Sequence, residues 1–306
     1  MTEVNWSAGV AWMRGEIMPI ARATIPVTDW GLTHSDITYD VVHVWDGKFF
    51  RIDDYLARFE HSLEKCRLSV PQSREEMKDI LHAIVVRSGL RESYVSVVAS
   101  RGQPRIPGSR DPRDCENHFY AWCVPFVWVF TKDVVQRGAR LYVPDDVHRI
   151  ATDSVDPTAK NYHWGDFTQG LMTAKETGFD NTLLLDADGH VTEGPGFNVF
   201  MVKDGAVKTP RKGVLEGITR RTAMEMARGA GLSVKESDIA LAEYLEADEL
   251  FATTTGGGIV AIVQVGERLF SNGVIGPITK SLQQTYWDWH NDPTMSEPVR
   301  YEVEPA

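Results

Sequence analysis

The sequence predicts a mixed α/β protein, arranged as two domains or as one large α/β domain with an elaborated end. Its 306 residues are about two domains' worth of chain. Apolar residues make up 42% and charged residues 25%, close to the averages of folded proteins, which argues against disorder, collagen-like repeats and coiled coils. Segments typical of strands and of helices follow one another along the chain, as the α/β class requires.

The chain opens with short strands. Residues 9–13 and 39–45 carry strand patterns, and a turn at 14–16 follows the first of them. Asp46-Gly47 is typical of a hairpin turn and leads into a further strand at Phe49-Phe50. The first fifty residues are therefore expected to be rich in β structure.

Two helices are expected next. Asp53 or Asp54 caps the first, which runs to Cys66 with its apolar residues on one side. That side comprises Tyr55, Leu56, Phe59, Leu63 and Cys66. The second helix, about 73–88, carries an apolar stripe and ends at Gly89, a usual C-terminal signal. Its stripe comprises Met77, Ile80, Leu81, Ile84 and Val85.

The first part of the chain closes with two strands and a long loop. A strand is expected at 94–100, a loop rich in Pro, Gly, Arg and Asp at 102–114, and a buried strand at 119–130. We therefore expect three parts: a small N-terminal α/β domain over 1–130, an interdomain linker over 131–137, and a large C-terminal domain over 138–306.

After Gly138 the pattern of strands and helices restarts. The expected elements are a strand at 139–144, a polar stretch to 161, a helix at 164–177, strands through 208, a helix at 218–230 and a shorter helix at 241–247. Residues 250–265 form two strand segments, separated by the run Thr253-Thr254-Thr255-Gly256-Gly257-Gly258. No internal repeat is evident.

Charge and cysteine content narrow the class of partner. The formal net charge is −11 and is spread along the chain, which argues against nucleic acid or an anionic membrane as partner. Cys66, Cys115 and Cys123 form neither an even framework nor a CxxC pair, so we expect no disulfide scaffold and no metal site. A signal-peptide pattern and an apolar span of about 20 residues are both missing, and a cytoplasmic location is expected.

Lys160 is the first candidate for chemistry. It lies in a polar loop before a helix that contains Trp164 and Phe167. An ammonium held beside aromatic surface loses its proton more easily, and the free amine can form a Schiff base with a carbonyl. The alternative is an ordinary solvated lysine.

Three further segments could surround a ligand. Glu193 precedes Gly194-Pro195-Gly196, where glycines allow close backbone approach, although the segment alone is a turn. Residues 213–219 run into a helix, so free amides and the Thr219 hydroxyl converge as in a phosphate site or an ordinary N-cap. The run 253–258 adds hydroxyls and open backbone.

Taken together, these features match the requirements of a pyridoxal phosphate site. The site needs an amine nucleophile, an acid for a ring nitrogen and segments that cradle a phosphate. Arg58, on the first expected helix, would complete the charge balance around the phosphate.

The motifs resemble those of the fold-type IV, branched-chain-aminotransferase-like pyridoxal phosphate enzymes, and the resemblance covers nearly the whole chain. It is carried by Asp54-Tyr55-Leu56-Ala57-Arg58-Phe59, Lys160-Asn161, Glu193-Gly194-Pro195-Gly196-Phe197-Asn198, Leu215-Glu216-Gly217-Ile218-Thr219-Arg220 and Thr254-Thr255-Gly256-Gly257. The resemblance implies that Lys160 carries the Schiff base and is catalytic, and that Glu193 pairs with the pyridine nitrogen. It implies cofactor contacts, mainly to the phosphate, from Arg58, Leu215, Gly217, Ile218, Thr219, Thr254 and Thr255.

Within that family the chain is most similar to the (R)-selective amine transaminases. The resemblance lies in residues 32–40, 43–47 and 160–166. Branched-chain enzymes place a tyrosine where this chain has Gly165, and D-amino-acid transaminases carry a different arginine and histidine pattern at 94–102. The implied substrate-site residues are His34, Tyr39, Val41, Tyr94 and Trp164. Each of the aromatic residues among them could equally pack in the core.

The resemblance also implies the architecture. It implies a small N-terminal α/β domain and a larger C-terminal cofactor-binding domain with a β-barrel-like core. It implies a homodimer, the cofactor between the domains, and loops of the partner that close the pocket. The rival functions are a D-amino-acid or branched-chain transaminase, a lyase of the aminodeoxychorismate type, and a cofactor-binding protein without turnover.

The loop at 102–114 offers a receptor for a keto-acid carboxylate, which needs a guanidinium for a bidentate pair. Arg101, Arg105, Arg110 and Arg113 lie in or beside it, and we favour Arg105 or Arg110. An amine donor has no carboxylate, so the arginine would have to move aside for one half-reaction. The alternative is a solvated basic loop.

Overall fold

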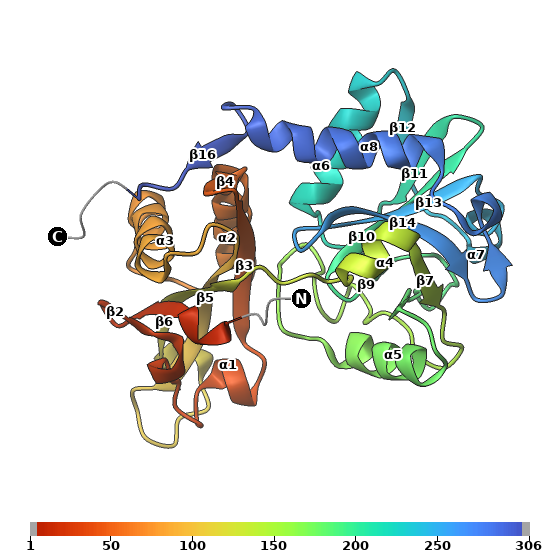
Figure 1. Ribbon diagram of the computed structural model, residues 1–306. Coiled ribbons are helices and arrows are strands. Elements are labelled where there is room, and N and C mark those ends of the chain that lie inside the picture. The colour runs from red at the N-terminus through yellow and green to blue at the C-terminus, as the bar shows by residue number, and fades with distance from the viewer. Residues whose placement is uncertain (1–4, 302–306) are drawn as a thin grey trace. The chain divides into compact units, whose positions relative to one another are not determined.

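The computed structural model describes residues 5–301 and divides the chain into two compact units (Figure 1). The first unit comprises residues up to 127, the short segment 159–162, and residues from 290 onward. The second unit comprises residues 128–158 and 163–289. Lys160 therefore belongs to the first unit, although its neighbours on both sides in the sequence belong to the second.

An antiparallel sheet forms the centre of the first unit. Among the described residues its strands stand in the order β16-β4-β3-β5-β6-β1-β2. The strands are β1 (Val10–Met13), β2 (Glu16–Pro19), β3 (Ile37–Trp45), β4 (Lys48–Phe50), β5 (Ser93–Pro104), β6 (Cys115–Pro125) and β16 (Ser296–Pro298). The first unit also contains the short helix α1 (Trp30–Thr33).

Helices α2 (Ile52–Lys65) and α3 (Arg74–Ser88) pack against this sheet, α2 on β3 and α3 on β1 and β6 (Figure 1). Tyr55, Leu56 and Phe59 are fully buried, which confirms the expected apolar side of α2. The expected cap is wrong, because α2 begins earlier, with Arg51 as N-cap in the left-handed conformation at φ 56°. Asp53 and Asp54 instead lie in the first turn, where acidic side chains favour a helix N-terminus.

Local signals determine both ends of α3. Ser73 and Glu76 form a capping box, in which each side chain bonds the backbone amide of the other. Gly89 ends the helix at φ 70°, a conformation that glycine adopts without steric cost. The predicted helix at 73–88 is confirmed to within one residue.

Two strand predictions in the first unit differ from the structure. The strand expected at 119–130 is β6, which starts at Cys115 and ends at Pro125, since proline cannot donate a ladder hydrogen bond. The strand expected at 94–100 continues to Pro104, so the loop after it is shorter than predicted. The C-terminal segment, for which no helix or strand was predicted, supplies an edge strand of the first sheet, because β16 pairs antiparallel with β4.

A second, mixed sheet forms the centre of the second unit. Among the described residues its order is β12-β11-β10-β13-β14-β7-β8, with β9 paired to β10 and β15 to β14. Its strands are β7 (Ala139–Tyr142), β8 (Asn181–Thr182), β9 (Glu193–Gly194), β10 (Phe197–Lys203), β11 (Ala206–Pro210), β12 (Ser233–Ser237), β13 (Glu249–Thr254), β14 (Gly258–Val265) and β15 (Arg268–Leu269). Apolar residues of β10, β13 and β14 are almost wholly buried and build the core.

The second unit contains the helices that the sequence predicted and two that it did not, at 277–288 and at 132–137, the second of which lies in the segment expected to be a linker. Its helices are α4 (Lys132–Arg137), α5 (Gly165–Glu176), α6 (Ile218–Gly229), α7 (Leu241–Tyr244) and α8 (Pro277–Asp288). Helix α7 ends at Tyr244, three residues before the predicted end. Helices α6 and α8 pack against each other and against β13 and β14 (Figure 1).

Short 3-10 helices complete the described elements: η1 (Trp6–Ala8), η2 (Ile20–Arg22), η3 (Pro112–Asp114), η4 (Ser271–Gly273) and η5 (Trp289–Asn291). Over residues 5–301, none of the helices has the length and apolar character needed to cross a bilayer.

Candidate functional site

Lys160 of the first unit lies on irregular backbone, and its peptide is held from three sides. Its carbonyl oxygen accepts hydrogen bonds from Thr38 Oγ1 at 2.6 Å and from the Tyr39 amide at 3.2 Å. Its amide donates to Ser62 Oγ at 3.2 Å. Strand β3 and helix α2 therefore position the lysine that the sequence singled out.

The Lys160 side chain lies beside aromatic residues. Its Nζ is 4.5 Å from the centre of the Tyr39 ring, and the Tyr39 and Tyr162 rings are 4.3 Å apart. Burial raises the pKa of the Tyr94 and Tyr162 hydroxyls well above the usual value, so both phenols stay neutral.

Three predicted substrate-site residues share one face of the first sheet. Tyr39 and Val41 are two residues apart on β3, so their side chains lie on the same side of the sheet. The strand register places Tyr94 of β5 opposite His43, on that same side. Tyr39 and Val41 belong to one apolar cluster, against which Tyr94, Tyr120 and Trp122 pack. The structure therefore brings Tyr39, Val41 and Tyr94 together in the part of the first unit that also holds Lys160.

Arg58 has a buried acidic partner. Its Nε and Nη2 donate to the two oxygens of Asp40 at 2.8 and 2.7 Å, and the Asp40 side chain is 1% exposed. Burial acts to lower the pKa of Arg58, but Asp40 outweighs it and the pKa is raised. The sequence interpretation missed Asp40, because its partner is 18 residues away. The role of Arg58 toward a phosphate stays a prediction.

His34 is exposed and lies at the C-terminal end of α1, stacked on Trp30 at 4.4 Å, with Nδ1 2.8 Å from Thr33 Oγ1. A second histidine, which the sequence interpretation missed, is more firmly held. His118 Nε2 lies 2.7 Å from Oδ2 of the buried Asp29. Burial acts to raise the pKa of Asp29, but hydrogen bonds from His118, Ser100 and the Gly31 amide lower it.

The four arginines of the 102–114 region divide into two pairs. Arg101 is held by Asp36 and by the carbonyls of Cys66 and Arg67. Arg113 forms a bidentate pair with Asp111. Arg105 and Arg110 are exposed, and neither makes a side-chain hydrogen bond or ion pair to the described residues.

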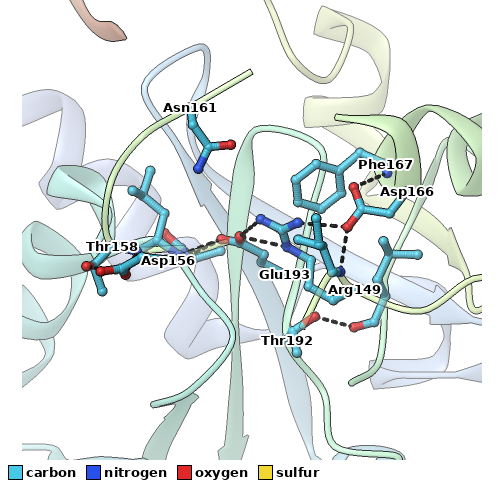
Figure 2. Close-up of polar contacts among 12 residues, drawn as sticks. Arg149, Asp156, Thr158, Asn161, Asp166, Phe167, Thr192 and Glu193 are labelled. Atoms are coloured by element: carbon cyan, nitrogen blue, oxygen red, sulfur yellow. Dashed lines mark hydrogen bonds and ion pairs between the residues drawn. The ribbon is translucent and has the colours of Figure 1, made fainter. Parts of the chain in front are cut away.

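Glu193 of the second unit is buried, and four donors point at its carboxylate. Arg149 donates to Oε1 from Nε at 3.3 Å and from Nη2 at 3.2 Å (Figure 2). Asn198 Nδ2 and the Leu215 amide donate to Oε2 at 3.1 and 2.9 Å. An ionised carboxylate can accept at both oxygens in this way.

Arg149 and Asp166 are functional candidates that the sequence interpretation missed. Arg149 Nη1 donates to Asp166 Oδ2 at 2.7 Å, and its guanidinium lies 4.2 Å above the Phe167 ring (Figure 2). Arg149 lies in the polar stretch 145–161, which has no periodicity, and its partners are 17 and 44 residues away. No local signal could have identified it.

Glu193 and the segment that starts α6 meet at one end of the second sheet, whereas the predicted phosphate residue Arg58 belongs to the first unit. Register places Glu193, Asn198 and Thr253 in one row across β9, β10 and β13. Asn198 also donates to the Leu215 carbonyl, which ties this row to the segment that starts α6. A side chain at Gly217, the N-cap of α6, would collide with Asn198, so the close approach requires glycine.

Two hydroxyls at this end are suited to a ligand. Thr219 Oγ1 and Thr253 Oγ1 are buried and have no hydrogen-bond partner among the described residues. Buried hydroxyls normally have a hydrogen-bond partner, so both are available to bond a ligand at this end of the sheet. The first amides of α6, at Ile218 and Thr219, lack intrahelical partners, as at every helix N-terminus. Thr254 is buried and accepts from the Gly256 amide at 3.2 Å, and Thr255 follows it.

Trp164, the remaining predicted substrate residue, is the N-cap of α5 in the second unit. Its ring packs edge-on against Phe167 at 5.5 Å. A cavity of about 400 Å³ lies beside it and is lined mainly by Trp164, Phe167, Leu171, Met172 and Pro195.

These groups fit pyridoxal phosphate. The α6 N-terminus and the unpartnered threonine hydroxyls suit a phosphate, and the buried Glu193 suits a ring nitrogen. The fold and the site together define a pyridoxal-phosphate-dependent aminotransferase. The family model described as "Amino-transferase class IV" matches residues 38–265, so the chain belongs to this fold-type IV family. Class IV aminotransferases use pyridoxal 5′-phosphate.

Two curated relatives have similar length. A Methanocaldococcus jannaschii protein provisionally named branched-chain-amino-acid aminotransferase is 29% identical, over 90% of this chain and 95% of its own. D-alanine aminotransferase from Listeria monocytogenes is 28% identical, over 86% of this chain and 90% of its own. Among solved structures, the branched-chain aminotransferase from Thermoproteus uzoniensis with norvaline has a TM-score of 0.83 at 27% identity, over 95% of this chain and 99% of that one.

Proposed function

We propose that this aminotransferase moves the amino group of an (R)-configured primary amine to a keto acid such as pyruvate. The products are a ketone and D-alanine. The (R) preference is supported by the resemblance of residues 32–40, 43–47 and 160–166 to (R)-selective amine transaminases.

The observation that carries the proposal is a sheet face beside Lys160 that is made mainly of apolar and aromatic side chains. Along β3, β5 and β6 the residues on that face are Ile37, Tyr39, Val41, His43, Tyr94, Ser96, Val98, Ser100, His118, Tyr120, Trp122 and Val124. This face carries no arginine and no lysine of its own. An α-amino-acid donor would need a cation for its carboxylate, whereas an aryl or alkyl amine needs apolar surface.

Each predicted residue then has a distinct task. Bound pyridoxal phosphate supplies an electron-withdrawing ring that acidifies the donor's Cα–H bond. Lys160 Nζ carries the proton between the donor carbon and the cofactor carbon. Glu193 keeps the ring nitrogen protonated, and Thr219 with the α6 amides holds the phosphate.

A second candidate is an α-amino-acid transaminase. It is favoured by the names of the relatives, which include branched-chain and D-alanine aminotransferases. The exposed Arg105 and Arg110 would then serve both half-reactions instead of one.

The resemblance further supports a cytoplasmic homodimer in which partner loops close the pocket.

The test supplies pyruvate to the cofactor-loaded protein with (R)- or (S)-1-phenylethylamine. Acetophenone formation and the visible absorption of the bound cofactor are followed together. Turnover of the (R)-amine alone is the expected result. Turnover of neither amine, with a spectral response to D-alanine or leucine, would replace the proposal by the corresponding amino-acid transaminase. Silence toward all donors would favour a lyase or a cofactor carrier.

A further inference from the structure

Lys160 has no regular secondary structure to hold it. It belongs to no helix or strand, and the stretch before it, 151–159, consists mainly of turns and bends. A group that transfers a proton must stay within a fraction of an ångström of its target. Its position therefore comes from contacts with other elements: the Tyr39 amide, the isolated bridge between Thr38 and Asn161, and two side-chain hydroxyls.

Two buried hydroxyls supply that hold. Ser62 on α2 and Thr38 on β3 are both 0% exposed. Ser62 Oγ accepts the Lys160 amide at 3.2 Å and donates to the Arg58 carbonyl at 3.0 Å, so both of its roles are fixed. Thr38 Oγ1 donates to the Lys160 carbonyl at 2.6 Å.

We infer that Ser62 and Thr38 are positioning residues, whose hydroxyls clamp the two sides of the Lys160 peptide so that its amine meets the cofactor in a bonding geometry. The inference rests on the proposed role of Lys160. The clamp also links the lysine to Arg58, which lies one helical turn from Ser62 and is itself fixed by Asp40.

Two forms of the cofactor can isolate this effect. Pyridoxal phosphate carries an aldehyde, to which a lysine amine can bond with loss of one water. Pyridoxamine phosphate carries an amine at that carbon and cannot form the bond. The affinity for the first depends on where the Lys160 amine lies, and the affinity for the second does not.

The experiment measures the dissociation constants of both cofactor forms for the full-length apoprotein and its variants. Ser62→Ala should raise the dissociation constant of pyridoxal phosphate about fivefold, which is the effect of losing one hydrogen bond. Its affinity for pyridoxamine phosphate should stay within about twofold, because no bond to Lys160 contributes to it. In turnover, kcat should fall about tenfold with little change in the amine KM.

The chain offers matched controls. Ser93 of β5 is also 0% exposed, and its hydroxyl has no hydrogen-bond partner among the described residues, so Ser93→Ala should leave the ratio of the two constants unchanged. Thr38→Val should act as Ser62→Ala does, without a change in side-chain shape. Thr38→Ser, which keeps the hydroxyl, should restore the wild-type ratio.

Lys160→Ala separates the two proposals. Suppose that Lys160→Ala loses its greater affinity for pyridoxal phosphate over pyridoxamine phosphate, while Ser62→Ala and Thr38→Val keep the wild-type ratio of the two constants. The clamp is then wrong and the role of Lys160 stands. If Lys160→Ala keeps that affinity and its turnover, both proposals fail. An equal loss for both cofactor forms in Ser62→Ala would show a general structural defect and would also overturn the clamp.

Discussion

Arg149 lies between the buried carboxylate of Glu193 and the partly buried carboxylate of Asp166: it donates to Glu193 Oε1 from Nε and Nη2 at 3.3 and 3.2 Å, and to Asp166 Oδ2 from Nη1 at 2.7 Å. The side chains of all three are at most 11% exposed. One cation therefore lies between two acidic side chains. In the proposed function, the Glu193 carboxylate would hold the protonated ring nitrogen.

Arg149→Met should be strongly destabilising, because it leaves the buried Glu193 and the partly buried Asp166 without the cation between them. Breaking a buried pair costs about 3–5 kcal/mol, and the loss should appear in the free energy of unfolding measured with urea. Arg137→Met is the control. Arg137 is 42% exposed in its pair with Asp180, and the expected cost is below about 1 kcal/mol. Equal losses in the two variants would contradict the central role of Arg149.

Thr219→Val should weaken pyridoxal phosphate binding without destabilising the apoprotein. The Thr219 hydroxyl has no partner among the described residues, so valine removes nothing that the apoprotein uses. A hydrogen bond to a charged group contributes about 1.5–3 kcal/mol, so the dissociation constant should rise about tenfold or more. Fluorescence titration measures the binding, and thermal unfolding of the apoprotein measures stability. Thr285→Val on α8 should change neither, and a wild-type affinity in Thr219→Val would remove Thr219 from the phosphate site.

Local signals predicted most of the elements but not the contacts that complete the site. Helix α3 was predicted from its apolar stripe at 77–85 and from Gly89, which follows its last residue, because both signals are local in the sequence. The predicted N-cap of α2 was wrong. The left-handed Arg51 takes that position, and its amide donates a hydrogen bond to the carbonyl of Met295, which is far away in the sequence.

The same limit applies to the candidate site. Lys160, Glu193 and Thr219 lie in motifs that can be identified in the sequence. Their partners Ser62 and Arg149 are ordinary polar residues outside those motifs, and their importance follows only from their closeness in space. Asp40 likewise stands in a strand pattern, and only the fold pairs it with Arg58.

Glu297 on β16 should make the stability of the protein depend on acid pH. It contacts Lys78 at 2.6 Å, His82 at 3.0 Å and Arg300 at 3.7 Å. Burial acts to raise the pKa of Glu297, but Lys78 and His82 outweigh it and lower the pKa below its usual 4.5. The stabilisation is therefore present above about pH 4.5 and is lost as the pH falls through the folded-state value.

The comparison of wild type with Glu297→Gln tests this. The difference in free energy of unfolding, measured by urea titration, should be constant near neutral pH and shrink below about pH 4.5. Burial and the nearby Arg300 lower the pKa of His82, so His82 stays neutral at about pH 7. Glu246→Gln serves as the control, because Glu246 makes no ion pair among the described residues. A difference that grows in acid would contradict the assignment.

Arg105 and Arg110 should matter for the keto acid and not for the amine. Both are exposed and carry no side-chain partner among the described residues, whereas Arg113 is committed to Asp111. A bidentate bond to a carboxylate contributes about 1.5–3 kcal/mol, so replacing the correct arginine by glutamine should raise the KM for pyruvate about tenfold or more. The half-reaction with 1-phenylethylamine, which brings no carboxylate, should change less than about twofold by the same reasoning. Single-turnover kinetics of each half-reaction separate the two effects, with Arg113→Gln as the control. Equal losses in both half-reactions would exclude a carboxylate receptor in this loop, since a group that meets only the keto acid cannot slow the amine step.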